Sequence, residues 1–221
     1  MEKPYKYQMK PLFRERMQAL LKDKSDFEKF EKIIHTHPRN FIRCNTIKIS
    51  PEELIVKLKQ KPWKVEQPFP TNPEIILVTS ELLPGELGNA LEHILGYYYI
   101  QEVSSMLSPI ALQPKPNELI LDLTASPGSK TTQIAMYMQN KGTIIANDNK
   151  IGRIKILSSN LGRTGITNTI ITRKDAVALC ARFSKSSFPK FDKILLDAPC
   201  SGEGTIRSSP KTFLMWNYKV I

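Results

Sequence analysis

The sequence predicts an α/β protein built around a doubly wound parallel sheet, on the basis of three observations. In the second half of the chain, short apolar runs alternate with segments of helical spacing, which is the pattern of strands joined by crossover helices. An acidic residue ends or follows each of four successive apolar runs, where sheets of this kind bind their ligands. The first and last runs continue into turns rich in Pro and Gly, which are Asp122-Leu-Thr-Ala-Ser-Pro-Gly-Ser-Lys-Thr131 and Leu196-Asp-Ala-Pro-Cys-Ser-Gly-Glu-Gly-Thr205.

Residues 1–38 are predicted to form an N-terminal helical segment. Apolar residues recur at helical spacing from about residue 11 to residue 34, which indicates one amphipathic helix across that range. The run His35-Thr-His-Pro38 ends this helix, because a proline disfavours helical backbone at the residue before it.

Residues 39–94 are predicted to form a small α+β module that ends near Gly88. Alternation of apolar and polar residues over 41–48 predicts one strand, and the apolar run 75–78 predicts another. Between them, Ser50-Pro-Glu-Glu53 is typical of a helix start, with Pro at the first helical position and acids in the first turn.

Residues 95–221 are predicted to form the parallel sheet and its helices. The expected helices are 104–112, 130–139 and 153–161, and the expected strands are 119–123, 143–147, 168–172 and 193–197. A doubly wound sheet normally continues beyond four strands, so we expect this sheet to be incomplete at its C-terminal end. Strand 193–197 would then present an unpaired apolar edge, which predicts poor solubility or a partner strand.

Composition limits the class of protein. With 221 residues, 41% of them hydrophobic, the chain can hold one large domain, or a small domain and a larger one, around a real core. No apolar stretch approaches the roughly 20 residues that span a bilayer, and the N-terminus lacks the apolar centre of a signal peptide. Cys44, Cys180 and Cys200 are too far apart for a disulfide framework or a CxxC metal site. We therefore expect a reduced, cytoplasmic protein with no membrane partner and no metal.

The charge balance indicates a polyanionic partner. Lys and Arg number 32 against 21 acidic residues, which gives a formal net charge of +11 and a pI near 9.5. Such an excess favours nucleic acid through electrostatic steering and counterion release. A solvated basic surface is the alternative that charge alone leaves open.

The segment from Asp122 to Thr131 is the first candidate site. Pro127 and Gly128 permit a tight turn with close backbone approach, and the following helix presents free N–H groups at its start. Those groups suit a carboxylate or a phosphate. The spacing is neither GxGxxG nor GxxxxGK[ST], which disfavours NAD and nucleoside triphosphates. A plain strand–helix turn is the alternative.

Acidic residues at the other strand ends extend this candidate site. Asp148, about 20 residues beyond the glycine turn, could bind two ribose hydroxyls. Asp175 offers an acceptor near an adenine amino group, and Asp197 ends the fourth apolar run. Each acid alone could be a solvated loop residue or a helix cap, whereas four acids at four successive strand ends indicate a shared ligand site.

Cys200 is the candidate for a reactive thiol. Pro199 and Gly202 place it in a loop rather than a core strand, which favours an exposed, functional sulfur over a small buried hydrophobe. Cys44, in an alternating strand, and Cys180, in an apolar helix, are interpreted as structural.

The histidines and tryptophans are assigned ordinary roles. His35 and His37 have no accompanying cluster of ligands, so they are assigned to the surface or to capping. Trp63 and Trp216 are interpreted as packing residues, with base stacking as the alternative for Trp216.

Four groups of residues, taken together, resemble one known family. They are Arg43-x-Asn45-Thr46 with Tyr99-x-Gln101-x-x-Ser104-Ser105; Asp122-x-x-Ala125-x-Pro127-Gly128-x-Lys130-Thr131; Asn147-Asp148 with Arg153, Leu157, Asn160, Arg163 and Gly165; and Asp175 with Asp197-Ala-Pro-Cys-Ser-Gly202, Gly204, Arg207 and Pro210. This set resembles the Sun family of S-adenosylmethionine-dependent RNA cytosine-C5 methyltransferases. The resemblance covers about residues 41–216 and is most specific at 197–202.

The resemblance implies a Rossmann-like methyltransferase sheet that binds S-adenosyl-L-methionine. It assigns Asp148 to the ribose hydroxyls, Asp175 to the adenine, and Arg153 to support of the nucleotide pocket. Asp197 would lie between the cofactor and the target cytosine, whose N3 edge it would bond. The residues assigned to the methionine-bearing end of the cofactor are Thr124, Ala125, Ser126, Pro127, Gly128, Ser129 and Lys130.

The resemblance also implies catalytic roles for Asp197 and Cys200 in methyl transfer to C5 of a cytosine in tRNA or rRNA. A thiolate adds to C6, the N3 edge is held, and C5 then attacks the sulfonium methyl group. The base must be accessible in a loop or flipped out of its stack, and the module at 39–94 would hold the RNA. In the family a cysteine of a later Thr-Cys loop is the nucleophile, and the position of Cys200 assists product release.

The chain departs from the family pattern in two places. Thr124, Ser126 and Ser129 stand where the family often has Cys, Ala and Gly, which are small changes that leave the turn plausible. No Thr-Cys loop follows within the 221 residues, so the chain is a fragment, a second chain completes it, or Cys200 acts alone, as Pro-Cys does in DNA cytosine methyltransferases. A non-catalytic RNA-binding remnant and a DNA methyltransferase are the competing functions.

Overall fold

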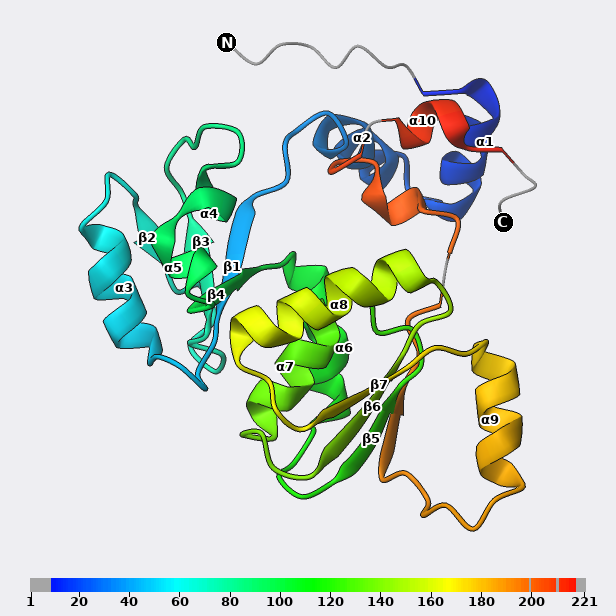
Figure 1. Ribbon diagram of the computed structural model, residues 1–221. Coiled ribbons are helices and arrows are strands. Elements are labelled where there is room, and N and C mark those ends of the chain that lie inside the picture. Colours follow the sequence, from blue (N-terminus) through cyan, green and yellow to red (C-terminus); the bar gives the residue numbers. More distant parts are fainter. Residues whose placement is uncertain (1–8, 199, 210, 218–221) are drawn as a thin grey trace. The chain divides into compact units, whose positions relative to one another are not determined.

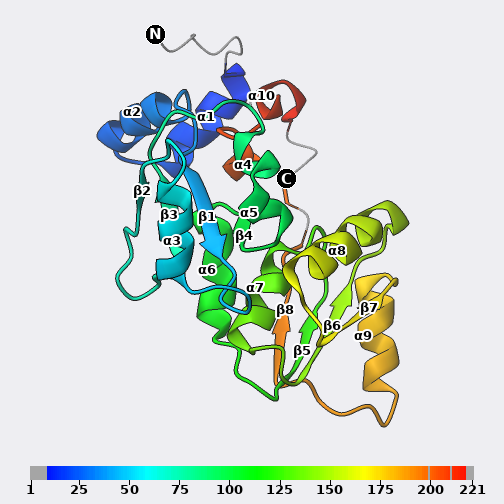
Figure 2. The same cartoon turned by 60° about the vertical axis from the view of Figure 1, so that its left-hand side comes forward.

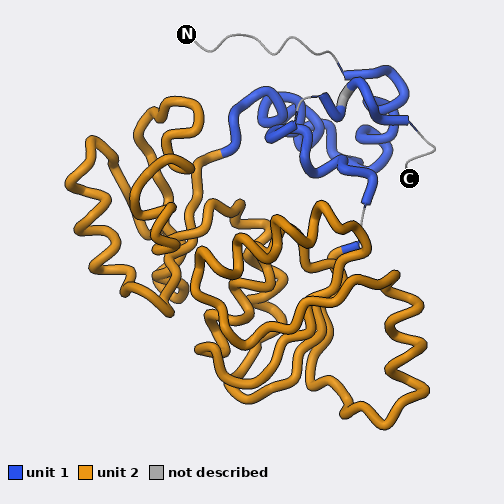
Figure 3. The backbone as a smooth tube through the Cα atoms, viewed as in Figure 1, with its two compact units in different colours: residues 1–38, 198–221 blue, residues 39–197 orange. Residues whose placement is uncertain are grey.

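A computed structural model describes residues 9–198, 200–209 and 211–217 of the chain (Figure 1). These residues form two compact units, one from the described parts of 1–38 and 198–221, the other from 39–197 (Figure 3). Pro199 and Pro210 of the predicted motifs, together with residues 1–8, lie outside the described residues.

The first unit begins with two helices where the sequence predicts one. Helix α1 (Pro11–Leu20) ends before Asp23, and helix α2 (Lys24–Ile33) begins after it. The side chain of Asp23 caps α2 by accepting a hydrogen bond from the Ser25 backbone N–H at 2.7 Å. The helical periodicity continues across this break, but a capping aspartate starts a new helix, so the prediction of a single helix is wrong.

The apolar face of these helices packs against the C-terminal segment of the chain. That segment contains the short 3₁₀ helix η1 (Glu203–Thr205) and helix α10 (Thr212–Met215). Trp216 meets Phe13 edge-on with ring centroids 5.1 Å apart, which confirms its packing role. The described residues of this C-terminal segment therefore share a core with the N-terminal helices, although the sequence assigns them to the domain 95–221. The division into three domains stays a prediction. The core residues are Phe13, Met17, Phe27, Ile34, Ile206 and Trp216.

The second unit contains a four-stranded antiparallel sheet in the order β2-β3-β1-β4. Its strands are β1 (Asn40–Cys44), β2 (Val65–Glu66), β3 (Ile75–Val78) and β4 (Tyr98–Ile100), and its helices are α3 (Pro51–Lys59), α4 (Glu86–Asn89) and α5 (Leu91–Ile94). Ser50 and Glu53 form a reciprocal capping box at the start of α3, as the sequence indicates. The first strand is shorter than predicted because Asn45 starts a turn, and β4 continues the sheet beyond residue 94.

Buried apolar side chains from α3 and from the sheet face that it covers form the core of this module. Cys44 belongs to that core, and burial raises the pKa of its thiol to about 12, which supports the structural role predicted for it. Trp63 is also buried there, as predicted, and its indole N–H donates to Glu86.

The four predicted strands of the second sheet are present and run parallel in the order β7-β6-β5-β8 (Figure 2). The strands are β5 (Leu119–Asp122), β6 (Thr143–Asn147), β7 (Thr169–Thr172) and β8 (Lys193–Leu195). The helices are α6 (Val103–Leu112), α7 (Ser129–Tyr137), α8 (Ile151–Thr164) and α9 (Ala176–Ser184). The prediction of a doubly wound α/β fold is confirmed.

Helices cover both faces of this sheet (Figure 1). Helices α7 and α8 pack on one face through Ile134 and Leu157, and α9 packs on the other through Leu179. Cys180, the next residue of α9, is exposed, so the interpretation of this cysteine as a structural packing residue is wrong. Among the described strands β8 ends the sheet on its side, and Ile194 within it is half exposed.

Gly96 provides a test of the contact between the two sheets. Its φ is +74°, and a Cβ atom there would lie 2.0 Å from the carbonyl oxygen of Arg163. We expect Gly96→Ala to destabilise the chain by about 3 kcal/mol, since left-handed strain and overpacking each cost about 1–3 kcal/mol. Urea unfolding followed by circular dichroism measures this. The matched control is Gly162→Ala on α8, where a Cβ meets nothing within 4 Å and stability should stay level or rise; equal stabilities of the two variants would contradict the prediction.

Candidate active site

The four predicted carboxylates lie at one edge of the parallel sheet. All strand pairs of this sheet are parallel, so the carboxyl ends of its strands share an edge. Asp122 is the last residue of β5, Asp148 directly follows β6, Asp175 precedes α9 after β7, and Asp197 follows β8. The topology therefore gathers four acids that are spread over 76 positions of sequence, from 122 to 197.

Asn147 ties the loops of three strands together. Its side-chain amide donates to the carbonyl oxygens of Leu123, at 3.1 Å, and Lys174, at 2.9 Å, while its Oδ1 accepts from the Lys174 backbone N–H at 3.0 Å. Because Asn147 is buried, these bonds are shielded from water. The loops after β5, β6 and β7 are thus fixed relative to one another.

The turn after β5 has the conformation that the Pro-Gly pair indicates. Gly128 has a φ of +106°, and a Cβ there would approach the Leu157 side chain to 3.0 Å, so both conformation and space favour glycine. Helix α7 starts at the next residue, and no side chain caps it. Its first N–H groups have no partner within the helix and can bind an anionic group.

Asp122 is buried below this turn and stabilises its conformation, rather than facing a ligand. It is 1% exposed, and its Oδ2 accepts a 2.7 Å hydrogen bond from the Thr131 hydroxyl. Burial raises the pKa of Asp122 to about 6, although the bond from Thr131 opposes that shift.

Asp148 and Arg153 form the second part of the site. Asp148 is 5% exposed, accepts from the Arg153 Nε at 2.9 Å, and accepts from the Lys150 backbone N–H at 3.0 Å. Arg153 also donates to the carbonyl oxygen of Ser126, whose hydroxyl donates back to the Arg153 carbonyl at 2.7 Å. These bonds join the loop after β6 to the predicted cofactor turn.

Asp197 meets Lys130 and Thr124 at the junction of β5 and β8. The Lys130 ammonium lies 2.7 Å from Asp197 Oδ2 and 3.1 Å from the hydroxyl oxygen of Ser105. Thr124 donates to the Asp197 carbonyl oxygen at 2.9 Å and accepts from its backbone N–H at 3.1 Å. The Asp197 side chain is 57% exposed, so it can still accept hydrogen bonds from a ligand.

Two predicted residues stand apart from these contacts. Asp175 is exposed and caps α9 by accepting from the Ala178 backbone N–H at 3.0 Å, which leaves its other oxygen available to an adenine amino group. Cys200 is exposed, as expected of a functional thiol, and belongs to the first compact unit. Its proximity to Asp197 stays a prediction.

Sequence reasoning missed residues that organise the site from elsewhere in the chain. Asn147 is named in the motif, but its bridging role is not apparent from spacing. Ser105 and Arg43, both part of the resemblance, reach Lys130 and the start of α7 from the N-terminal half of the unit. The signal in the sequence that could have indicated these residues is the presence of polar side chains within strands and helices that are otherwise apolar.

The residues present fit S-adenosylmethionine. The uncapped start of α7 suits the carboxylate of its methionine part, and the Asp148 carboxylate has lone pairs left for ribose hydroxyls after its two hydrogen bonds. The glycine at 128 allows the turn that places these N–H groups, since its φ is +106° and a side chain there would meet Leu157.

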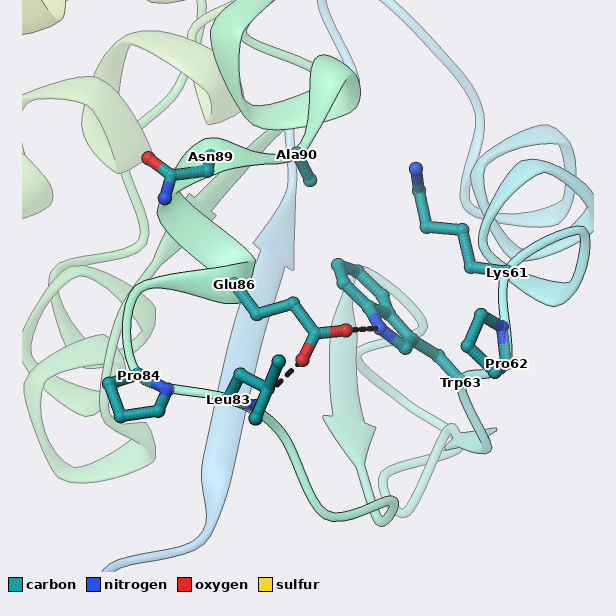
Figure 4. A pocket seen from close by; sticks show the side chains of 8 residues that line it. All are labelled: Lys61, Pro62, Trp63, Leu83, Pro84, Glu86, Asn89 and Ala90. Carbon is teal, nitrogen blue, oxygen red and sulfur yellow. Dashed lines mark hydrogen bonds between the residues drawn. The ribbon is translucent and has the colours of Figure 1, made fainter.

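A separate cavity of about 460 Å³ lies in the antiparallel module (Figure 4). The Trp63 indole donates to Glu86 within it at 2.6 Å, and the Lys61 ammonium stands 5.6 Å from the Trp63 ring centroid. None of the residues predicted to bind the cofactor or to act in catalysis lines this cavity, so it is distinct from the candidate active site.

The described residues contain no group of three or more His, Cys, Asp or Glu side chains that could hold a metal ion. Across the same residues, every helix is too short or too polar to cross a membrane.

Comparison with known proteins identifies the family. Residues 109–217 match the family described as 16S rRNA methyltransferase RsmB/F, and residues 9–103 match the N-terminal domain of 16S rRNA methyltransferase RsmF. The chain belongs to this family. These are Sun-family, S-adenosylmethionine-dependent RNA methyltransferases, so the resemblance drawn from the motifs is confirmed.

Curated relatives of the RsmB/F family are longer than this chain. Ribosomal RNA small subunit methyltransferase F is 45% identical over 183 residues in Shewanella sediminis, 42% over 186 in Vibrio atlanticus and 38% over 213 in Erwinia tasmaniensis. The alignments cover 80%, 83% and 94% of the chain but 37%, 38% and 43% of those proteins. The chain thus spans about two fifths of their length.

Solved structures of the family share the fold. PH0851 superposes with a TM-score of 0.84 at 31% identity, covering 96% of this chain and 46% of that one. NSun6 from Pyrococcus horikoshii, solved with SFG, gives a TM-score of 0.79 at 25% identity and covers 94% of this chain and 74% of that one. The Rossmann-like methyltransferase sheet is therefore a shared feature of this family.

The buried Asp122 predicts a pH dependence of stability. Its pKa is about 6 in the folded chain and near 4 when unfolded, so the folded state binds the extra proton between those values. The stabilisation of the fold that comes from this bound proton is fully present below about pH 4 and is lost as the pH rises through 6. Asp122→Asn cannot ionise, so its unfolding free energy relative to wild type should rise by about 3 kcal/mol between pH 4 and pH 7.

Urea unfolding at several pH values measures this difference. Glu66→Gln, at an exposed position of β2, is the matched control and should follow the wild-type profile. An Asp122→Asn profile parallel to wild type from pH 4 to pH 7 would show that Asp122 ionises normally in the fold.

Proposed function

We propose that this chain carries the cofactor-binding part of an enzyme that transfers a methyl group from S-adenosylmethionine to C5 of a cytosine in small-subunit ribosomal RNA. The observation that carries the proposal is the half-exposed Asp197, whose carboxylate is held by Lys130 and whose backbone is held by Thr124, beside the uncapped start of α7. This arrangement sets a carboxyl group that can contact a base next to a cradle for the cofactor.

Three elements would hold the cofactor. The N–H groups at the start of α7 would bind its carboxylate, Asp148 its ribose hydroxyls, and Asp175 its adenine amino group. Arg153 orients Asp148 through their 2.9 Å contact. When bound, the cofactor supplies a methyl group on a positively charged sulfur.

The chain's own residues would act on the base. C5 of cytosine is a weak nucleophile until a thiolate has added to C6 and N3 has received a proton or a hydrogen bond, which the Asp197 carboxyl group would supply. C5 would then attack the methyl group, and loss of the C5 proton would expel the thiolate. Lys130, 2.7 Å from Asp197 Oδ2, fixes the position of that carboxyl group. Cys200 is the proposed thiol, acting on C6 or, as the family resemblance implies, in product release.

Ribosomal RNA is the proposed substrate, rather than tRNA, because the relatives at 38–45% identity are named small-subunit rRNA methyltransferases. The net charge of +11 agrees with a nucleic-acid partner. We propose that the antiparallel module contributes to RNA binding, and that the reaction takes place in the cytoplasm, where ribosomes assemble.

Cofactor binding is the first test of this proposal. Isothermal titration should detect binding of S-adenosylmethionine, and Asp148→Asn should weaken it at least about tenfold, the factor expected when a hydrogen bond to a charged group is lost. Glu66→Gln is the control and should bind like wild type. Absence of binding, or equal binding by the Asp148 variant, would count against the site.

Methyl transfer is the second test. The chain is incubated with small-subunit rRNA and with cofactor labelled in the methyl group, and the RNA is then digested to nucleosides. The complete product of the gene is tested in the same way where it is longer than this chain. We expect label in 5-methylcytidine and a loss of turnover in Asp197→Asn, because the N3 edge is no longer held by a carboxyl group. Label in another nucleoside, or in tRNA instead of rRNA, would overturn the assignment.

A further inference from the structure

A buried arginine joins the antiparallel sheet to the cofactor turn. Arg43 lies on β1 and is 1% exposed. Its guanidinium donates to the Ser129 carbonyl oxygen at 2.7 Å and to the Thr132 hydroxyl at 2.8 Å, both in the first turn of α7. It also donates to the side-chain oxygen of Gln101, which follows β4.

This guanidinium has no carboxylate partner among the described residues. Ion pairs within 4.0 Å are found for other cations of the unit, such as Lys130 and Arg153, but not for Arg43. Besides these neutral oxygens, the guanidinium has the Tyr99 ring, whose centroid lies 5.4 Å away, and the attraction of the Glu74 carboxylate beyond ion-pair distance. A buried charge with such partners often adds no stability over an apolar side chain of similar volume. Its position in the fold therefore calls for an explanation other than stability.

The hydrogen bonds continue from Arg43 to the carboxylate at the end of β8. Because Gln101 Oε1 accepts from Arg43, its Nε2 faces the other way, where it donates to Gln133 Oε1 at 3.1 Å and toward the Ser105 hydroxyl oxygen at 3.4 Å. Ser105 accepts the Lys130 ammonium at 3.1 Å through its remaining lone pair, and Lys130 donates to Asp197 at 2.7 Å.

A second connection reaches the same lysine through the backbone. Arg43 holds the carbonyl oxygen of Ser129, the residue directly before Lys130. The backbone next to Lys130 is thus held from the antiparallel sheet by Arg43, and the Lys130 ammonium is held by Ser105 on α6.

We propose that Arg43, Gln101 and Ser105 are positioning residues that hold Lys130 against Asp197. The antiparallel sheet is then a structural part of the active site in addition to any contact it makes with RNA. The importance of this arrangement for methyl transfer rests on the proposed function, whereas the arrangement itself can be tested without cofactor or RNA.

The test is an NMR measurement on the lysine ammonium group of the whole chain. In a ¹H–¹⁵N correlation spectrum we expect a slowly exchanging ammonium peak that is missing from Lys130→Arg. Ser105→Ala removes the hydroxyl acceptor from an α6 position where alanine is compatible with the helix. The peak should then exchange with water about tenfold faster and broaden, the factor that one hydrogen bond to a charged group contributes.

Matched variants separate positioning from a general loss of structure. Ser105→Thr keeps a hydroxyl and should restore the peak, and Ser104→Ala, at an exposed neighbouring position, should leave it unchanged. Arg43→Lys should also broaden the ammonium peak, because Arg43 lies at the other end of this chain of hydrogen bonds. Where the Arg43 variant does not fold, the comparison of Ser105→Ala with Ser105→Thr tests the proposal. A wild-type chain without the peak, or a Ser105→Ala chain that keeps it, would overturn the proposal. Failure to bind S-adenosylmethionine with the peak intact would instead refute only the proposed function.

Discussion

The site depends on a reversal of direction within the parallel sheet. From β5 the chain adds β6 and β7 on one side, and then crosses back to place β8 on the other side of β5. Since crossovers are right-handed, this reversal puts α7 and α8 on one face and α9 on the opposite face. The loops that follow β5 and β8 lie at the point where the strand order reverses, which is where open α/β sheets bind their ligands. Thr124 and Asp197 bond to each other there, so the proposed catalytic carboxyl group and the proposed cofactor turn are neighbours.

Burial separates the four carboxylates into different tasks. Asp122 and Asp148 are buried, and the hydrogen bonds that they accept from Thr131, Lys150 and Arg153 fix the loops that carry them; Asp148 keeps lone pairs for the proposed ribose contact. Asp197 is held by one cation but remains largely exposed. A carboxylate that is already oriented and still accessible can bind a substrate group with little further ordering, which is the condition for preorganised catalysis.

Much of the sheet could be predicted because its determinants are local. Apolar runs marked all four strands, and an acid at the end of each run marked the ligand edge, since parallel strands necessarily end together. The unpredicted features depend on contacts between distant segments. The break at Asp23 is a capping event within a continuous periodic pattern, and the exposure of Cys180 depends on which face of α9 meets the sheet. No local signal indicates that residues 198–217 pack against the N-terminal helices, or that Arg43 reaches residues 86 and 89 positions away.

The contact between the two sheets of the second unit is made largely through side chains that donate to backbone carbonyl oxygens. Asn45 donates to the carbonyls of Gly96 and Thr164 at 2.9 and 2.8 Å, and Arg163 donates back to that of His93 at 2.7 Å. Apolar surfaces can slide over one another at small cost, whereas a buried donor that leaves its carbonyl loses a hydrogen bond with no water to replace it. Such an interface is stable in one register only. Lys130 holds its ammonium 2.7 Å from a carboxylate, and the backbone of the preceding residue is held from the antiparallel sheet by Arg43. This arrangement requires that register, and we infer that the requirement explains why the interface is polar.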